Sequence, residues 1–205
     1  MPKYLDKKVI KNLLRARGEV RGATLIGDRE YIVGHCGKSK LKEVEKKLKE
    51  LGVDLKYEKI KDLEFYPAGL RVISLLAIAE VCNLDKEGVK NLCSLQPKFS
   101  LVLKLFSKFL LSTKKAFEQA PNFWREHFTT GELSVKEVNE EKGYVILRLK
   151  NFKMYPLYCK CLEGYIKGIA KIIVGSDKVT CEETKCVFKG DPYHEFLIKW
   201  PRKAK

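Results

Sequence analysis

The sequence lacks any long run of apolar residues, and none approaches the roughly eighteen that a membrane-spanning helix requires. Its first residues, 1–8, have no apolar core of the kind that marks a secretion signal. We therefore expect a cytoplasmic protein that does not span a membrane. Because nothing points to secretion, we also expect the seven cysteines to be reduced thiols rather than a disulfide framework.

Two common cofactor fingerprints are also missing. No Gly-x-Gly-x-x-Gly motif follows a predicted strand, so nothing indicates a nicotinamide or flavin enzyme. No Cys-x-x-Cys pair marks a standard zinc site. His35 and Cys36 follow a predicted strand, but neighbours on a strand point apart, which disfavours a nucleophile pair. We expect a binding protein rather than an enzyme.

Positive charge is abundant, with 41 basic and 26 acidic residues and a net charge of +15. The lysines are spread over residues 38–49, 56–61, 104–115 and 142–160 and are mixed with glutamates. No recognisable nucleic-acid reader motif accompanies them, so we expect only non-specific, salt-sensitive binding to nucleic acids. A surface rich in lysine and glutamate is also typical of thermophile proteins.

The hydrophobic periodicity predicts one α+β domain, with a twisted antiparallel sheet covered by helices. A period of 3.6 predicts helices over 5–17, 41–51, 67–82, 85–95, 99–117, 121–128 and 155–174. A period of 2 predicts strands near 133–138, 144–149, 178–188 and 193–200. The Gly27-Asp28 dipeptide predicts a hairpin turn between strands 20–26 and 31–33, and a further strand is expected over 53–60.

Four potential metal ligands gather in the last quarter of the chain: Cys159, Glu183, Cys186 and His194. Zinc accepts all three ligand types and prefers four of them in a tetrahedron. Glu183 and Cys186 are three residues apart and would face opposite sides of a regular strand, so joint ligation requires a bulge between them.

Other interpretations of these residues stay open. Cys159 and Cys161 point about 200° apart on a helix, so only one of them can join the hairpin residues. Cys161 or Cys181 could replace one of the four ligands. Alternatively, the cysteines are small core residues and Glu183 forms an ion pair with Lys160 or Lys185.

The same residues carry a family resemblance. Cys159 precedes a Gly-Tyr-x-x-Gly motif at 164–168, and Glu183-x-x-Cys186 precedes Gly190-Asp191 and His194-x-Phe. This pattern resembles the 4-vinyl reductase domain family over residues 155–200, with histidine in place of the family's last cysteine. A looser resemblance extends over residues 20–200. The domain boundaries that it implies are a ligand-binding domain over 20–205 and an N-terminal helical extension over 1–19.

The resemblance implies a fold shared with heme-NO-binding sensors and with TRAPP subunits. It also implies a dimeric sensor that holds a small aromatic ligand in an apolar pocket beside a structural zinc. Carried over residue by residue, Cys159, Glu183, Cys186 and His194 form the zinc set. Such a sensor would act through an unidentified protein partner. A TRAPP-like dimeric assembly protein is the alternative function, and a basic nucleic-acid-binding protein is a further one.

The expected pocket lies between the helices of residues 67–128 and the sheet. Its candidate lining is aromatic, although these rings could equally form an ordinary core: Phe106, Phe109, Phe117, Phe123 and Trp124. Gly164 and Gly168 give the helix 155–174 a smooth face, which favours either a homodimer seam or close internal packing. His127 is a candidate heme ligand, but the Tyr-x-Ser-x-Arg motif of the heme sensors is absent.

Overall fold

The computed structural model describes residues 3–96 and 112–201. Phe106 and Phe109, two candidate pocket residues, lie outside this range. The helices are α1 Lys7–Leu14, α2 Ala23–Tyr31, α3 Lys38–Glu50, α4 Ala68–Val81, α5 Lys86–Leu95, α7 Thr113–Glu118, α8 Ala120–His127 and α9 Tyr158–Val174. The strands are β1 Glu19–Arg21, β2 Phe65–Pro67, β3 Glu132–Asn139, β4 Tyr144–Lys150, β5 Thr180–Lys185 and β6 His194–Lys199.

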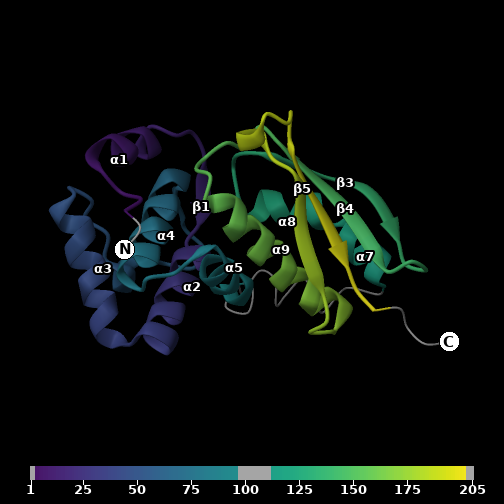
Figure 1. The fold of residues 1–205 in the computed structure, drawn as a ribbon, viewed down its shortest axis with the longest axis horizontal. Helices are drawn as coiled ribbons and strands as arrows, with labels where there is room; N and C mark the ends of the chain where they lie inside the picture. The colour runs from purple at the N-terminus through teal and green to yellow at the C-terminus, as the bar shows by residue number, and fades with distance from the viewer. Residues whose placement is uncertain (1–2, 97–111, 202–205) are drawn as a thin grey trace.

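The C-terminal strands form a four-stranded antiparallel sheet in the order β3-β4-β6-β5. Alternate residues of the central strands β4 and β6 are buried, which is the pattern of a sheet with one covered face. Helix α9 lies between this sheet and the N-terminal helices (Figure 1). The predicted α+β class and both C-terminal hairpins are confirmed.

Helix α4 is the centre of the N-terminal helices. It is apolar all round, as the sequence predicts, and nearly all of its residues are buried. A Cβ at Gly69 would lie 1.8 Å from the carbonyl oxygen of Leu13, so α1 and α4 can pack this closely only with glycine there. Within the described residues, no helix is long and apolar enough to cross a membrane.

Two expectations about secondary structure are wrong. Gly27 and Asp28 lie inside helix α2 instead of forming a hairpin turn. Gly27 gives room for a helix contact, because a Cβ there would lie 2.9 Å from the side chain of Gln96. The expected strand over 53–60 contains only a short 3-10 turn, Tyr57–Lys59, whose Tyr57 side chain is buried.

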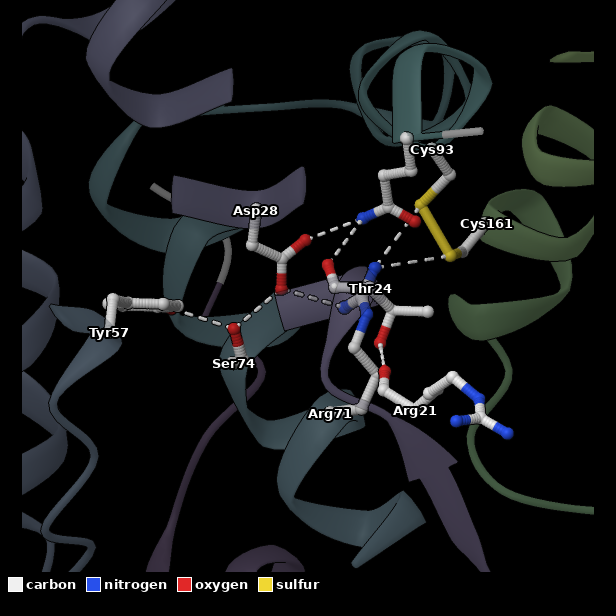
Figure 2. A network of polar contacts seen from close by, with 9 residues as sticks. Arg21, Thr24, Asp28, Tyr57, Arg71, Ser74, Cys93 and Cys161 are labelled. Atoms are coloured by element: carbon white, nitrogen blue, oxygen red, sulfur yellow. Dashed lines mark hydrogen bonds and ion pairs between the residues drawn. A yellow bond between two sulfur atoms is a disulfide. The ribbon is translucent and has the colours of Figure 1, made fainter. Parts of the chain in front are cut away.

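The N-terminal helices enclose a network of buried polar groups (Figure 2). The carboxylate of Asp28 lies 3.1 Å from the Arg71 guanidinium and accepts hydrogen bonds of 2.7 Å from Ser74 and from Gln96. Tyr57 extends the network with a 2.7 Å hydrogen bond to Ser74. Burial raises the pKa of Asp28 to about 6, although the charge of Arg71 opposes this rise.

Cys93 of α5 and Cys161 of α9 form a disulfide, and Nη2 of Arg71 lies 3.6 Å from each sulfur (Figure 2). The expectation that all cysteines are reduced is therefore wrong for this pair. The two residues are far apart in sequence and come together only because α5 packs against α9, which local spacing could not reveal.

The predicted smooth face of α9 serves close internal packing. A Cβ at Gly164 would lie 2.0 Å from the carbonyl oxygen of Lys90, so α5 and α9 meet backbone to backbone at this glycine. Gly164 therefore no longer supports a dimer seam. The homodimer stays a prediction that rests on the family resemblance alone.

The close contact at Gly164 generates a stability prediction. Replacing Gly164 with alanine puts a methyl group into the α5 backbone, and overpacking of this kind costs about 1–3 kcal/mol. Denaturant unfolding should show this loss for Gly164→Ala. Gly34→Ala is the matched control, because a Cβ at Gly34 meets nothing within 4 Å. Equal unfolding free energies for the two variants would contradict the proposed helix contact.

Candidate metal centre and apolar pocket

Four side chains from three elements converge at one end of the sheet. Cys159 lies in the first turn of α9, Glu183 on β5, Cys186 just after β5, and His194 at the start of β6. Their potential ligand atoms all lie within 4.8 Å of one another. The two sulfurs are 3.6 Å apart, close to the roughly 3.8 Å expected between thiolates about 2.3 Å from a tetrahedral zinc.

A β-bulge brings Glu183 and Cys186 to the same side. The register between β5 and β6 shifts between Glu183 and Lys185, so the alternation of side chains is interrupted there. The bulge that joint ligation requires is thus confirmed.

The turn after β5 fixes the backbone of Cys186. The Asp191 carboxylate accepts a hydrogen bond of 2.8 Å from the Cys186 amide, and the Cys186 carbonyl accepts bonds from the amides of Lys189 and Asp191. Gly190 has a φ of +96°, a conformation that favours glycine. The Gly-Asp pair of the sequence motif therefore has a structural reason, since it closes the turn that presents the Cys186 thiol.

Both ring nitrogens of His194 have oxygen neighbours. Nε2 lies 2.8 Å from the carbonyl oxygen of Phe152, and a carbonyl only accepts, so Nε2 carries a hydrogen and donates it. Nδ1 lies 2.7 Å from Oε1 of Glu183. In a neutral imidazole this arrangement leaves Nδ1 a lone pair on the side of Glu183, where it could bind a metal. An outer hydrogen bond like that of Nε2 is typical of metal-binding histidines.

The centre is buried and electrostatically suited to a cation. Cys159, Cys186 and His194 are each at most 4% exposed. Burial raises the pKa of the Cys159 thiol, and the nearby Glu183 carboxylate and Cys186 raise it further. A divalent cation reverses this balance, because its charge stabilises the thiolates that bind it. The chemistry of this donor set therefore fits a metal ion.

The alternative partners of these residues are engaged elsewhere. Cys161 is in the disulfide, and Cys181 is buried on β5 but is not part of the converging group. Lys160 pairs with Glu163 at 2.6 Å, and Lys185 contacts Tyr193.

Glu163 is a further buried charge beside the centre, which the sequence analysis did not single out. Burial opposes its ionisation, but hydrogen bonds from Lys160 and Lys90 outweigh burial and hold the pKa of Glu163 below its usual range.

An apolar pocket of about 40 Å³ lies between α7, α8, α9 and the sheet. Phe117, Phe123 and Trp124 line it, and α9 contributes Tyr165, Ile166, Ile169 and Ile173. This space exceeds the roughly 10–15 Å³ that one water needs, but it is smaller than the cavity of about 150 Å³ that holds benzene. Three of the five candidate pocket residues thus meet around one space.

His127 lies next to this pocket, fully buried at the end of α8. Its Nδ1 is 3.1 Å from the carbonyl oxygen of Phe123, and its ring packs against the rings of Phe123 and Tyr165. Burial lowers the pKa of His127 to about 4, so the ring is neutral at pH 7.

Comparison with solved structures identifies the fold. An H-NOX protein from S. oneidensis in the Fe(II)NO ligation state matches with a TM-score of 0.65 and 14% identity, over 87% of this chain and 98% of that one. An Fe(II) unliganded H-NOX protein from K. algicida matches with a TM-score of 0.62 and 8% identity, over 90% and 98%. The chain therefore has the H-NOX fold. No family profile matches the chain, and no curated protein matches it in sequence.

The described residues do not fit a heme, the cofactor that this fold implies. The His127 ring is covered by Phe123, with ring centres 4.3 Å apart, and by the edge of Tyr165. The adjoining pocket of about 40 Å³ is far below the several hundred Å³ of a typical cofactor site. The apolar pocket is thus too small for a heme.

The buried His127 generates a pH prediction. Its folded pKa of about 4 lies below the ordinary value of 6.5, so the unfolded chain takes up a proton first as the pH falls. The contribution of neutral His127 to the free energy of unfolding is complete above pH 6.5. It is lost as the pH falls to 4, and the total loss is about 3 kcal/mol. An NMR titration should show a neutral His127 ring at pH 5.5, and His127→Gln should have a flatter stability profile between pH 6.5 and 4. A ring that titrates near 6.5 would contradict this.

Proposed function

We propose that this protein is a small-molecule-binding sensor or regulatory domain with a structural zinc centre. The observation that carries the proposal is the convergence of Cys159, Glu183, Cys186 and His194 within 4.8 Å. The apolar pocket between α9 and the sheet supports the ligand-binding part. The 4-vinyl reductase motif supports both parts together, because that family combines such a centre with a pocket for small aromatic molecules.

Zinc is the metal that the donor set favours. Two thiols, an imidazole and a carboxylate suit its borderline-soft character, whereas magnesium and calcium prefer oxygen ligands alone. Four protein ligands fill the tetrahedron and leave no open position for a reacting water. The proposed role of the metal is therefore structural, and the proposal is a binding domain rather than an enzyme.

The first test of this proposal is metal content. Protein purified without added metal should contain about one zinc ion per chain, and Cys186→Ala should lose it. Cys181→Ala is the matched control, because Cys181 is buried on β5 but is not part of the converging group. Removing the zinc should lower the melting temperature, since metal binding and folding are coupled. Less than about 0.2 zinc per chain, or full retention in Cys186→Ala, would contradict the proposal.

The proposed ligand is a small hydrophobic or aromatic molecule. The pocket is lined almost entirely by apolar groups, and the Phe117, Phe123 and Trp124 rings offer faces for stacking. Because its volume is below that of a benzene cavity, an aromatic ligand must displace some of these side chains. We therefore propose that the ligand stabilises a more open arrangement of the helices around the pocket.

Ligand binding can be tested by thermal unfolding with phenol or toluene. A bound ligand stabilises the folded protein by mass action, by about 2.7 kcal/mol at a hundred times its dissociation constant. Ala116 is buried and lines the pocket, so Ala116→Leu should fill the space and abolish the rise in melting temperature. No rise in the unmodified protein, or the same rise in Ala116→Leu, would rule out this pocket as the binding site.

A further inference from the structure

Lys90 and Glu163 lie between the N-terminal helices and the candidate metal centre. We infer that Lys90 of α5 and Glu163 of α9 are positioning residues for this centre. They hold strand β5, which carries Glu183, so that a helix from the N-terminal half of the chain sets how tightly the centre binds its metal. This inference rests on the proposed zinc site. It says that two residues outside the set of four metal ligands affect the zinc affinity of that site.

The Glu163 carboxylate joins three separate parts of the fold. Its side chain is 2% exposed, and Oε1 accepts a hydrogen bond of 3.2 Å from the backbone amide of Glu183. Its other oxygen, Oε2, lies 2.7 Å from Nζ of Lys90, while Lys160 contacts Oε1. One buried carboxylate therefore forms a hydrogen bond with the backbone of the proposed metal ligand Glu183 and an ion pair with Lys90 of α5.

The Lys90 ammonium makes a second contact with the same strand. Nζ donates a hydrogen bond of 3.0 Å to the carbonyl oxygen of Cys181 on β5, two residues before Glu183. Lys90 thus connects α5 to α9 through Glu163 and to β5 through Cys181. It is the residue of α5 whose backbone meets Gly164, so the close approach of the two helices brings its side chain within reach.

This arrangement affects metal binding through geometry. Glu183 and Cys186 lie on either side of the bulge, and among the described residues β5 is an edge strand with a ladder partner only in β6. On its other edge, the amide of Glu183 bonds Glu163 and the carbonyl of Cys181 bonds Lys90. Loss of these contacts frees the strand on that side, and loss of partners that orient metal ligands typically lowers metal affinity by about 10-fold to 100-fold.

The test measures zinc affinity of the full chain by competition with a chromophoric chelator. Lys90→Met should bind zinc about 10-fold to 100-fold more weakly. Lys160→Met is the matched control, because Lys160 contacts the same carboxylate but comes from α9 itself and is one-third exposed. Its loss should weaken zinc binding by no more than about fivefold. Cobalt bound in place of zinc should show altered visible bands in Lys90→Met, because these bands report ligand geometry.

The outcomes separate the two proposals. If the unmodified protein binds no zinc, the proposed function fails, and this inference fails with it. If it binds zinc and Lys90→Met binds equally well with the same cobalt spectrum, only the inference fails. Equal losses in Lys90→Met and Lys160→Met would also overturn it, because charge alone would then explain the effect. If Lys90→Met does not fold, Glu163→Gln replaces it, and an unchanged zinc affinity in that variant overturns the inference.

Discussion

The structure depends on the contact between α5 and α9, where Gly164 meets the backbone of Lys90. Because no side chain separates the helices there, Cys93 and Cys161 come close enough to bond, and the Lys90 side chain reaches Glu163. The same approach puts the guanidinium of Arg71 against the disulfide. The N-terminal helices are therefore joined tightly to α9, which packs on the sheet, and the two halves share a continuous core.

Buried charges make this arrangement specific rather than merely stable. A buried ion pair gains little net free energy, because desolvation offsets the attraction, but removing one partner costs about 3–5 kcal/mol. Asp28 with Arg71 and Glu163 with Lys90 each join residues from two helices. Any other packing of α2 and α4 would leave a charge buried without its partner, and any other packing of α5 and α9 would leave Glu163 with only Lys160 of its own helix. The two pairs thus penalise alternative arrangements of α2, α4, α5 and α9.

The parts of the fold that the sequence predicts are those governed by local patterns. The change in hydrophobic period after residue 132 predicts β3, β4 and the closing hairpin, and a helical pattern predicts α9. The spacing of Glu183 and Cys186 requires the bulge only if both residues bind one metal. The hairpin turn predicted at Gly27 is wrong, because this glycine makes room for the side chain of Gln96. Only tertiary packing decides between these two roles of a glycine. In a lysine-rich sequence, no local pattern distinguishes Lys90 and Glu163 from ordinary surface charges. Arg71, a charge within the apolar run of α4, is a local sign of a buried network.

Helix α9 connects the proposed metal centre to the proposed ligand pocket. Cys159 lies in its first turn, whereas Ile166, Ile169 and Ile173 line the pocket along its later turns. Cys159 and Ile166 are seven residues apart, which is about 10 Å along the helix at 1.5 Å per residue, so the metal ligand and the pocket lining lie at different levels of α9. A metal that fixes one end of α9 also fixes which side chains the helix presents to the pocket. A structural ion can therefore govern ligand binding through helix placement alone, which explains how a centre without an open coordination position can matter to a sensor.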